Sequence, residues 1–526
     1  MKKLFLPAIA ILLFLIFSGI FTLSAQQASQ SAAAQQPSQS AAQQPSELAE
    51  QGLLFTLATE LPYRAGTYRE EIEARGLTPN ASISLQYEQP HIGLIAAIDL
   101  TSDQVYGPWL ADSPTGALGN FNFMIKEAGI RISGGSFSLK GGRLRHFDVV
   151  DSPYSLFINA NGIAAPMLDF VYRDDRFFYE SRYISLTLDS AMHTPAWPDD
   201  PSYTGFPDRG ANFKVFGLSF GRLTIGFEDS SVYSGRAFDW EYFLSPMPQY
   251  FTQYVRGTGG RPWYANYDDN YNAGLFVTWK EPGAYDLYAQ AFVDDLGMLG
   301  LFGWTNNPWQ IALALGGRIK TPKGTFGLHL AGATKYTFEP GDMRTPTTAN
   351  QIQSSYGYTY FPETRFEYEW RPSYPKSYKE IAPELNLIGY QYGENNLAMR
   401  LDWNGSVSKF ECEAFFEFRL SGSNSPANPW HDLWVDPQVA FTWLDDAVLE
   451  KRFTISARAI TGHSPWQFFA KATGSLALDA LELRDPIGVS SSQTLVDQKV
   501  QIYSPVPGNT KLLGELTLGV LLRLGI

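Results

Sequence analysis

The side chains best suited to acid–base or metal chemistry are two adjacent carboxylates, Asp294 and Asp295, which close the segment YDLYAQAFVDDL. Paired carboxylates can bind a hard cation or share a proton between an acid and a base. The residues before them alternate between apolar and other side chains, as in an extended strand. Asp-Asp pairs recur at 174–175, 199–200, 268–269 and 445–446. This recurrence favours sites where strands enter water over a metal site or a catalytic dyad.

Two further features bear on catalysis. The segment GLSFG, residues 217–221, matches the G-x-S-x-G motif, but that motif requires a helix after the serine, and the strand-like RLTIGFE follows instead. The six histidines show no metal-ligand spacing; His329 and His463 lie near predicted strands, and neither has an obvious partner in the sequence. The sequence therefore predicts a non-enzyme with no cofactor and no metal, and an outer-membrane hydrolase is the third alternative.

Aromatic, Pro-rich loops offer a different chemistry. Sugars present C–H faces that pack on aromatic rings and hydroxyls that pair with polar side chains. The loop residues suited to such contacts are Trp263, Tyr264, Tyr267, Asp268, Trp430 and Trp434. The alternative is an aromatic belt at a lipid interface, which uses the same residue types. The sequence leaves both interpretations open.

The elements that carry these residues alternate with a period of two. In SKFECEAFFEFRL the apolar positions from Phe410 to Leu420 oppose a charged set from Lys409 to Arg419, and residues 511–526 show one face without any polar side chain. Soluble sandwiches also alternate, but their strands average five or six residues, and these segments run beyond ten. Long strands with one dry and one charged face are typical of a barrel in lipid with a wet lumen.

Similar segments recur along the chain and predict an all-β fold: a closed antiparallel transmembrane β-barrel of about 16–18 strands. Closure follows because every backbone group in hydrocarbon needs a partner. The long loops are expected outside the cell, the short turns in the periplasm, and the protein in the cell outer membrane. No apolar run after the first 25 residues is long enough for a membrane helix.

Composition agrees with a lipid-covered surface. Only 18% of residues are charged and 15% are aromatic, whereas soluble domains are nearer a quarter charged. A net charge of -13 excludes a nucleic-acid partner, because phosphate binding needs a basic surface. The single cysteine, Cys412, excludes an internal disulfide and any cysteine-based zinc site.

The chain divides into four predicted regions. Residues 1–25 have the charged start, apolar centre and small final residue of a secretory signal peptide. Residues 26–46 contain only Gln, Ala, Ser and Pro and form a disordered linker. We expect a short periplasmic helical or irregular segment over 47–80, where TYREEIEARG supplies the helical pattern, and the barrel over 81–526.

Two stretches carry motifs that are more specific than the alternation found in any barrel. Residues 221–251, GRLTIGFEDSSVYSGRAFDWEYFLSPMPQYF, followed by 270–296, resemble the central region of the capsule-assembly Wzi family, and residues 383–404 resemble its Gly-rich strand pair. The positions that match are Glu228, Ser230, Tyr233, Arg236, Asp239, Tyr242, Asp294 and Asp295. The resemblance implies a barrel of about eighteen strands, with its lumen occluded by loops and a small periplasmic helical element. It also implies a lectin-like role in holding capsular polysaccharide.

We therefore expect a non-catalytic outer-membrane barrel that binds or organises surface polysaccharide. Its candidate ligand-binding residues are the matching positions other than Ser230, together with the aromatic-loop set, although the resemblance assigns no sugar contact to any of them. The expected partners are outer-membrane lipid, surface polysaccharide and the barrel-insertion machinery. The alternative is a diffusion porin, suggested by charged inward positions such as Glu417 and Arg419.

Overall fold

The computed structural model describes residues 52–67, 76–102, 122–159, 161–186, 208–265, 269–295, 308–339, 356–361, 365–367, 378–380, 383–424, 441–461, 465–484 and 502–525. The predicted signal peptide and linker lie outside these residues. The strands of the first half are β1 (Gly52–Gly66), β2 (Gly76–Leu77), β3 (Asn80–Glu88), β4 (Ile92–Thr101), β5 (Asn122–Gly134), β6 (Phe137–Leu144), β7 (Ala165–Arg173), β8 (Phe177–Ser185), β9 (Arg209–Phe220), β10 (Leu223–Ser234), β11 (Asn270–Glu281) and β12 (Tyr285–Asp295).

The second half is built in the same way, with few helices. Its strands are β13 (Gln310–Thr321), β14 (Gly324–Ala333), β15 (Arg365–Glu367), β16 (Tyr378–Glu380), β17 (Asn396–Val407), β18 (Phe410–Ser421), β19 (Glu450–Thr461), β20 (Trp466–Leu478), β21 (Leu481–Arg484), β22 (Ile502–Pro505) and β23 (Lys511–Gly525). The described residues include the helices α2 (Trp240–Leu244), α3 (Gln249–Gly257) and α5 (Pro383–Asn386). Within the described ranges, no helix has the length and apolar character needed to cross a bilayer.

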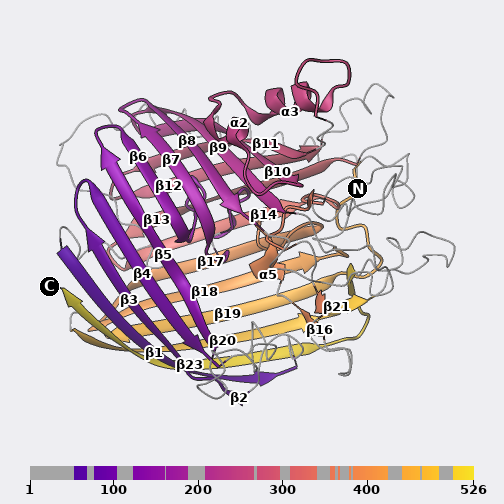
Figure 1. The fold of residues 1–526 in the computed structure, drawn as a ribbon. Coiled ribbons are helices and arrows are strands. Elements are labelled where there is room, and N and C mark those ends of the chain that lie inside the picture. Colours follow the sequence, from indigo (N-terminus) through magenta and orange to yellow (C-terminus); the bar gives the residue numbers. More distant parts are fainter. Residues whose placement is uncertain are drawn as a thin grey trace, which may run out of the picture. The chain divides into compact units, whose positions relative to one another are not determined.

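The strands form one closed antiparallel wall. The main sheet has 19 strands, of which the two-residue β2 pairs only with β1 in the described part of the chain, so 18 strands make the barrel. Closure occurs where β1 pairs with β3 on one side and with β23 on the other, in a register from Leu54–Gly525 to Gly66–Leu513. Figure 1 shows the first strand beside the last one. The predicted closed barrel of about 16–18 strands is confirmed.

Period-two alternation sets the two sides of the wall. On β23, Leu512, Leu516, Leu518 and Leu524 are exposed, and on β18 Phe410 and Phe416 are exposed, while Glu417 and Arg419 are buried. Successive side chains of a strand point to opposite faces, so the exposed apolar positions form the outer surface of the barrel. This apolar outer wall identifies lipid as its solvent, as the sequence pattern predicts.

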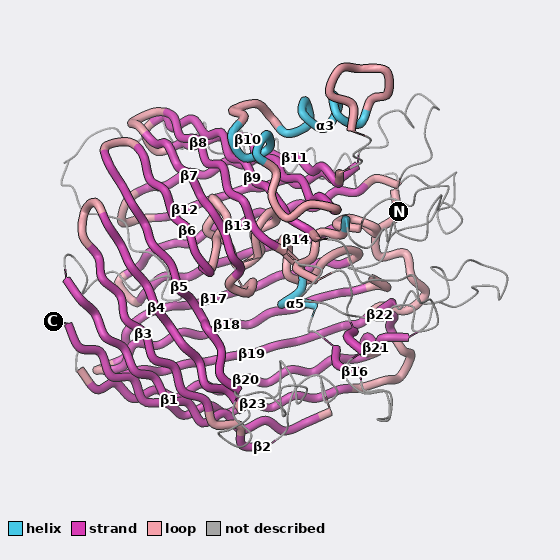
Figure 2. The backbone as a smooth tube through the Cα atoms, viewed as in Figure 1, coloured by secondary structure: helices cyan, strands magenta, loops and turns pink. Residues whose placement is uncertain are grey.

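The two ends of the barrel differ. Short turns such as 135–136, 221–222, 322–323 and 408–409 join strands at one end, which we call the short-turn end, and Figure 2 shows several of them together. The start of β1 and the end of β23 also lie there, because Gly52 pairs with Glu88 and Leu54 with Gly525. The opposite, long-loop end carries extended connections such as 145–164, 235–269 and 334–395. In outer-membrane barrels long loops face the outside of the cell.

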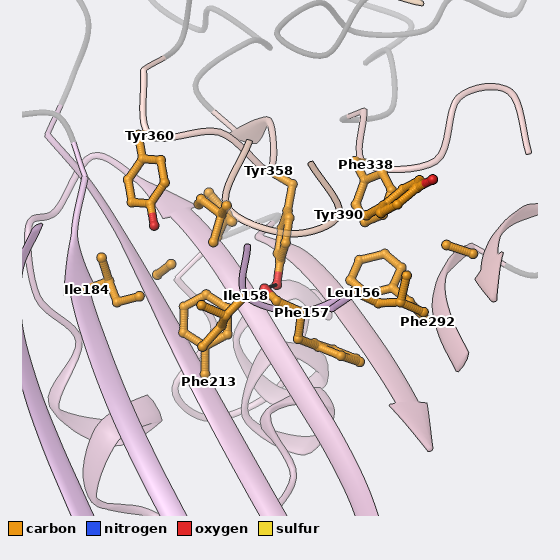
Figure 3. Packing of buried hydrophobic residues seen from close by; sticks show 14 of the residues in the cluster. Leu156, Phe157, Ile158, Ile184, Phe213, Phe292, Phe338, Tyr358, Tyr360 and Tyr390 are labelled. Carbon is orange, nitrogen blue, oxygen red and sulfur yellow. Dashed lines mark hydrogen bonds between the residues drawn. The ribbon is translucent and has the colours of Figure 1, made fainter. Parts of the chain in front are cut away.

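The main hydrophobic core lies inside the barrel. It joins inward residues of the wall, such as Phe213 and Phe292, to buried residues of the long connections, such as Leu156, Phe157 and Tyr358. Figure 3 shows these side chains meeting between the wall and the loops. Phe292 packs on Phe157 with ring centroids 4.8 Å apart and on Phe338 at 4.6 Å. The lumen is therefore filled by packed loops along this part of its length.

One predicted boundary is wrong. Residues 52–66, assigned from the sequence to a periplasmic segment that would precede a barrel beginning at 81, form β1, a full strand of the wall. The expected helix at 67–76 falls mostly outside the described residues.

Candidate functional site

The connection 145–164, which we call the inner loop, enters the lumen from the long-loop end. Asp148 accepts hydrogen bonds from the side-chain amide of Gln290 on β12 at 3.0 and 3.1 Å, and the same amide donates to Glu228 on β10 at 2.7 Å. Asp151 pairs with Arg318, 3.1 Å away, near the short-turn end of β13. The inner loop therefore reaches through most of the barrel and is fixed to several strands.

Inward charges of β18 hold the inner loop. Tyr154 donates a 2.7 Å hydrogen bond to one carboxylate oxygen of Glu417, and Tyr392 donates to the other. Arg419 is 3.2 Å from Glu450 on β19, and its guanidinium lies over the ring of Tyr392 at 4.1 Å. Two of the charges that suggested a porin, Glu417 and Arg419, are thus engaged in contacts with loop residues or with β19.

His329 lies in a linear chain of hydrogen bonds beneath the inner loop. Ser152 donates to the hydroxyl of Tyr288 at 2.6 Å, Tyr288 is 2.8 Å from His329 Nδ1, and His329 Nε2 is 3.0 Å from Asp402. The expectation that His329 has no partner is wrong. Tyr288 stands between the serine and the histidine, however, so His329 is not in contact with the hydroxyl that it would have to activate.

The connection that contains α2 and α3, residues 235–265, lies against the outside of the wall, and we call it the flap (Figure 1). Asp239 begins α2: its side chain accepts from the backbone N–H groups of Glu241 and Tyr242 at 3.0 and 3.1 Å. A carboxylate at this position satisfies N–H groups that no helical carbonyl can reach. The predicted site residue Asp239 therefore has a clear structural role.

An ion-pair network ties the flap together. Arg236 binds Asp239 at 2.7 Å and Asp269 at 2.7 Å, and Arg256 binds Asp239 and also Glu241, the latter at 2.7 Å. Burial raises the pKa of Asp239, but the hydrogen bond from Arg256 and the charges of both arginines outweigh it, so this pKa is lowered overall. The network fixes α2 and α3 to each other and to the start of β11.

Two tyrosines complete this network. Tyr242 donates to Asp269 at 2.7 Å, and the guanidinium of Arg236 lies 4.4 Å from the ring centre of Tyr233 and 5.8 Å from that of Tyr242. Such cation–π contacts favour a fixed arginine. The structure thus brings together four predicted site residues, Tyr233, Arg236, Asp239 and Tyr242. Three members that the sequence interpretation missed are Glu241, Arg256 and Asp269.

The tip of the flap, residues 261–264, carries exposed aromatic side chains. Trp263 is 84% exposed and Tyr264 46% exposed. Trp263 has a φ of 69°, in the left-handed region that non-glycine residues seldom adopt. Arg261 lies beside them, donates to the hydroxyl of Tyr254 at 2.9 Å and stacks on its ring at 4.8 Å. An exposed tryptophan held in a strained backbone offers a flat surface for a ligand.

The other predicted site residues do not join this group. Glu228 lies inside the lumen, on the opposite side of the wall from the flap. Asp294 and Asp295 lie where β12 ends, and Asp294 accepts from the backbone N–H of Phe338 at 3.2 Å, which agrees with the predicted rim position. The remaining candidates lie outside the described residues: Tyr267, Asp268, Trp430 and Trp434.

The described residues contain no group of three or more His, Cys, Asp or Glu placed to hold a metal ion. The GLSFG segment forms the predicted hairpin: β9 ends at Phe220, Gly221 and Arg222 make the turn, and β10 follows. Gly221 has a φ of 66°, which a hairpin turn requires. The nucleophile-elbow interpretation is excluded, because a strand follows the serine.

The closed 18-strand wall, its apolar outer face and its loop-filled lumen define an outer-membrane β-barrel. No protein-family model and no curated protein matches the sequence.

Several solved outer-membrane proteins are similar in structure. Wzi of Escherichia coli, described as a carbohydrate-binding β-barrel involved in group 1 capsule assembly, is 9% identical, with 88% of this chain and 83% of that chain covered and a TM-score of 0.47. OccAB4 of Acinetobacter baumannii is 11% identical, with 92% and 100% covered and a TM-score of 0.43. OmpT of Vibrio cholerae is 9% identical, with 90% and 96% covered and a TM-score of 0.31. Membership of the Wzi family stays a prediction.

Proposed function

We propose that this outer-membrane barrel binds surface polysaccharide at its extracellular end and does not transform it. The observation that carries the proposal is the flap tip, where Trp263 is 84% exposed in a left-handed backbone beside Tyr264 and Arg261. A flat, open indole suits the C–H face of a sugar ring, and the neighbouring guanidinium and phenol suit its hydroxyls or carboxylates. The strained backbone of Trp263 favours a role in binding over one in packing.

The filled lumen supports a binding role over free diffusion. A diffusion porin needs a continuous water path, and large barrels of that class leave an aqueous channel. Here the inner loop and the segments around Tyr358 and Tyr390 pack into a buried core inside the wall. The inward charges Glu417 and Arg419, which favoured the porin alternative, contact those segments or β19.

The polar chain from Ser152 to Asp402 gives no support to a hydrolase. His329 is fully buried and Ser152 is nearly so, and Tyr288 separates the two side chains. We therefore propose a non-catalytic protein. We also propose that residues 1–25 are a cleaved signal peptide, that 26–46 are a disordered tether, and that the barrel-insertion machinery places the barrel in the membrane.

The test is a pull-down of purified, refolded protein with surface polysaccharide from the producing strain. Trp263→Ala should weaken binding by about tenfold, equivalent to about 1.4 kcal/mol. The matched control is Trp240→Ala, which removes an indole of comparable exposure from α2 of the same flap and should leave binding unchanged. Absence of binding by the unmodified protein, with unchanged surface polysaccharide in a deletion strain, would refute the proposal.

A further inference from the structure

The outer surface of the barrel changes from apolar to polar along β9 and β10. Leu218 and Phe220 on β9 and Ile225 on β10 are exposed and point outward. Because side chains alternate along a strand, every second residue from these positions also points outward. Toward the long-loop end the same outward series continues as Asn212 and Lys214, and as Asp229 and Ser231. On β19, by contrast, Phe453 and Ile455 are exposed in the half nearest the long-loop end. The apolar belt of the barrel is therefore interrupted at β9 and β10.

The flap covers this polar area and hydrogen-bonds with Asp229 and Lys214 within it. The backbone N–H of Gln249 donates to Asp229 at 2.7 Å, and the side-chain amide of Gln249 donates to the carbonyl of Asn212 at 3.0 Å. Lys214 donates to the carbonyl of Met247 at 2.6 Å. On the neighbouring β8, Ser181 donates to the carbonyl of Phe243 at 2.6 Å. These wall residues are buried, so the side of the flap that faces the barrel makes polar contacts with it.

The opposite side of the flap is apolar. Its exposed apolar side chains are Trp240, Leu244, Met247, Tyr250, Phe251 and Tyr254. The carboxylate of Glu241 is also exposed and pairs with Arg256 at 2.7 Å. At the edge of the flap a groove of about 320 Å³ opens between α2 and the wall, lined by Pro166, Leu168, Tyr183, Phe238 and Trp240 among others. The apolar side of the flap continues the exposed apolar surface of Leu218, Phe220 and Leu275 on the strands that it covers.

We propose that the flap is a lipid-facing part of the barrel wall, with its apolar side among the acyl chains of the outer leaflet. The continuity of this side with the apolar belt selects lipid as the occupant. A buried lysine and aspartate on the outside of a barrel would be costly in hydrocarbon. The flap lowers that cost because its residues hydrogen-bond with Lys214 and Asp229. It presents the apolar side chains of Leu244 and Phe251 to the lipid instead. Only the tip around Trp263 then extends into water.

The test places a spin label on the flap in lipid bilayers. Cys412 is the only cysteine, so Cys412→Ser gives a background for single labels. A label at Phe251→Cys should collide with oxygen more than with a water-soluble nickel chelate, as should the lipid reference Leu275→Cys, which replaces a side chain that is 62% exposed on β11. The water reference is Lys409→Cys in the turn between β17 and β18.

A second label at Leu244→Cys, on α2, guards against a local effect of the first substitution. Two outcomes would overturn the proposal. Nickel accessibility at both flap positions equal to that at Lys409 would place the flap in water. Shielding of both flap positions from oxygen and nickel alike would mean that a protein surface covers them. The polysaccharide pull-down is independent of either result.

Discussion

Tyr154 of the inner loop and Glu417 of β18 are 263 positions apart in sequence and are joined by a 2.7 Å hydrogen bond inside the barrel. The second oxygen of the same carboxylate accepts from Tyr392, which belongs to the connection between β14 and β17. One wall residue thus holds two separate loop segments inside the barrel. Loss of this carboxylate would leave the buried hydroxyl of Tyr154 and the partly buried hydroxyl of Tyr392 without their acceptor, which is unfavourable.

We therefore expect Glu417→Ala to loosen the loops that fill the lumen. In planar bilayers the unmodified protein should show little conductance, and the variant should show frequent openings. The matched control is Glu411→Ala, an exposed inward charge on the same strand, which should behave like the unmodified protein. Large, stable channels from the unmodified protein would instead favour the porin alternative.

Gly274 on β11 is predicted to be essential for seating the inner loop. A Cβ at this position would lie 2.0 Å from the carbonyl oxygen of Ala291 and 2.7 Å from the ring of Phe157. Gly274→Ala should lower the free energy of unfolding by about 1–3 kcal/mol, because overpacked sites must shift. Gly514→Ala on β23 meets only one atom, at 3.9 Å, and should be nearly neutral. Urea unfolding in detergent micelles compares the two variants, and equal effects would contradict the prediction.

Asp229→Ala tests how the flap is held to the wall. The substitution leaves the buried N–H of Gln249 without its 2.7 Å acceptor, so the free energy of unfolding should fall by about 1–3 kcal/mol. Asp99→Ala breaks a 3.2 Å surface pair with Lys126 and should cost no more than about 1 kcal/mol. Thermal unfolding of both variants measures the difference. A smaller loss for Asp229→Ala than for Asp99→Ala would refute this account of the flap.

The flap should loosen in acid. The pKa of Asp239 is lowered below its ordinary value of 3.8, because the arginine contacts outweigh burial. A lowered folded-state pKa gives stability that is present above about pH 4 and is lost as the pH falls through the lowered value. The protection of the amides of residues 236–257 against hydrogen exchange, corrected for the intrinsic pH dependence of amide exchange, should therefore decrease as the pH falls below about 4. Asp239→Asn should show faster exchange already at neutral pH, and an identical pH profile in that variant would contradict the assignment.

Much of the wall could be predicted from the sequence because strand faces depend on local alternation. The apolar positions of 410–420 and 512–524 lie on the outer surface as predicted. The sequence pattern places the start of the barrel too late, although residues 53–63 alternate as well. Pro62 interrupts that segment, and proline is unfavourable inside strands. Here its position opposes Thr517, and its carbonyl accepts from Thr78 at 2.9 Å.

The candidate site was harder to predict, because residues that are close in sequence can lie on opposite faces of a strand. Glu228 was grouped with Tyr233 and Asp239, but it points into the lumen, whereas its neighbour Asp229 points outward to the flap. The pair of Arg256 with Asp239 depends on how α3 folds back on α2. The filling of the lumen joins residues such as Tyr154 and Glu417 across most of the chain, and local patterns carry no signal for such contacts.

The seam between β1 and β23 determines the order in which the molecule can be completed. Arg64 and Glu515 meet across it at 2.9 Å, although 451 positions separate them. Until that seam forms, two strand edges have unpaired backbone groups, which hydrocarbon does not tolerate. Assembly in the membrane must therefore be close to all-or-none, and a chain lacking β23 would expose the edge of β1 to aggregation. We expect the pairing of β1 with β23 to be a slow final step of folding, because the two strands are far apart in sequence.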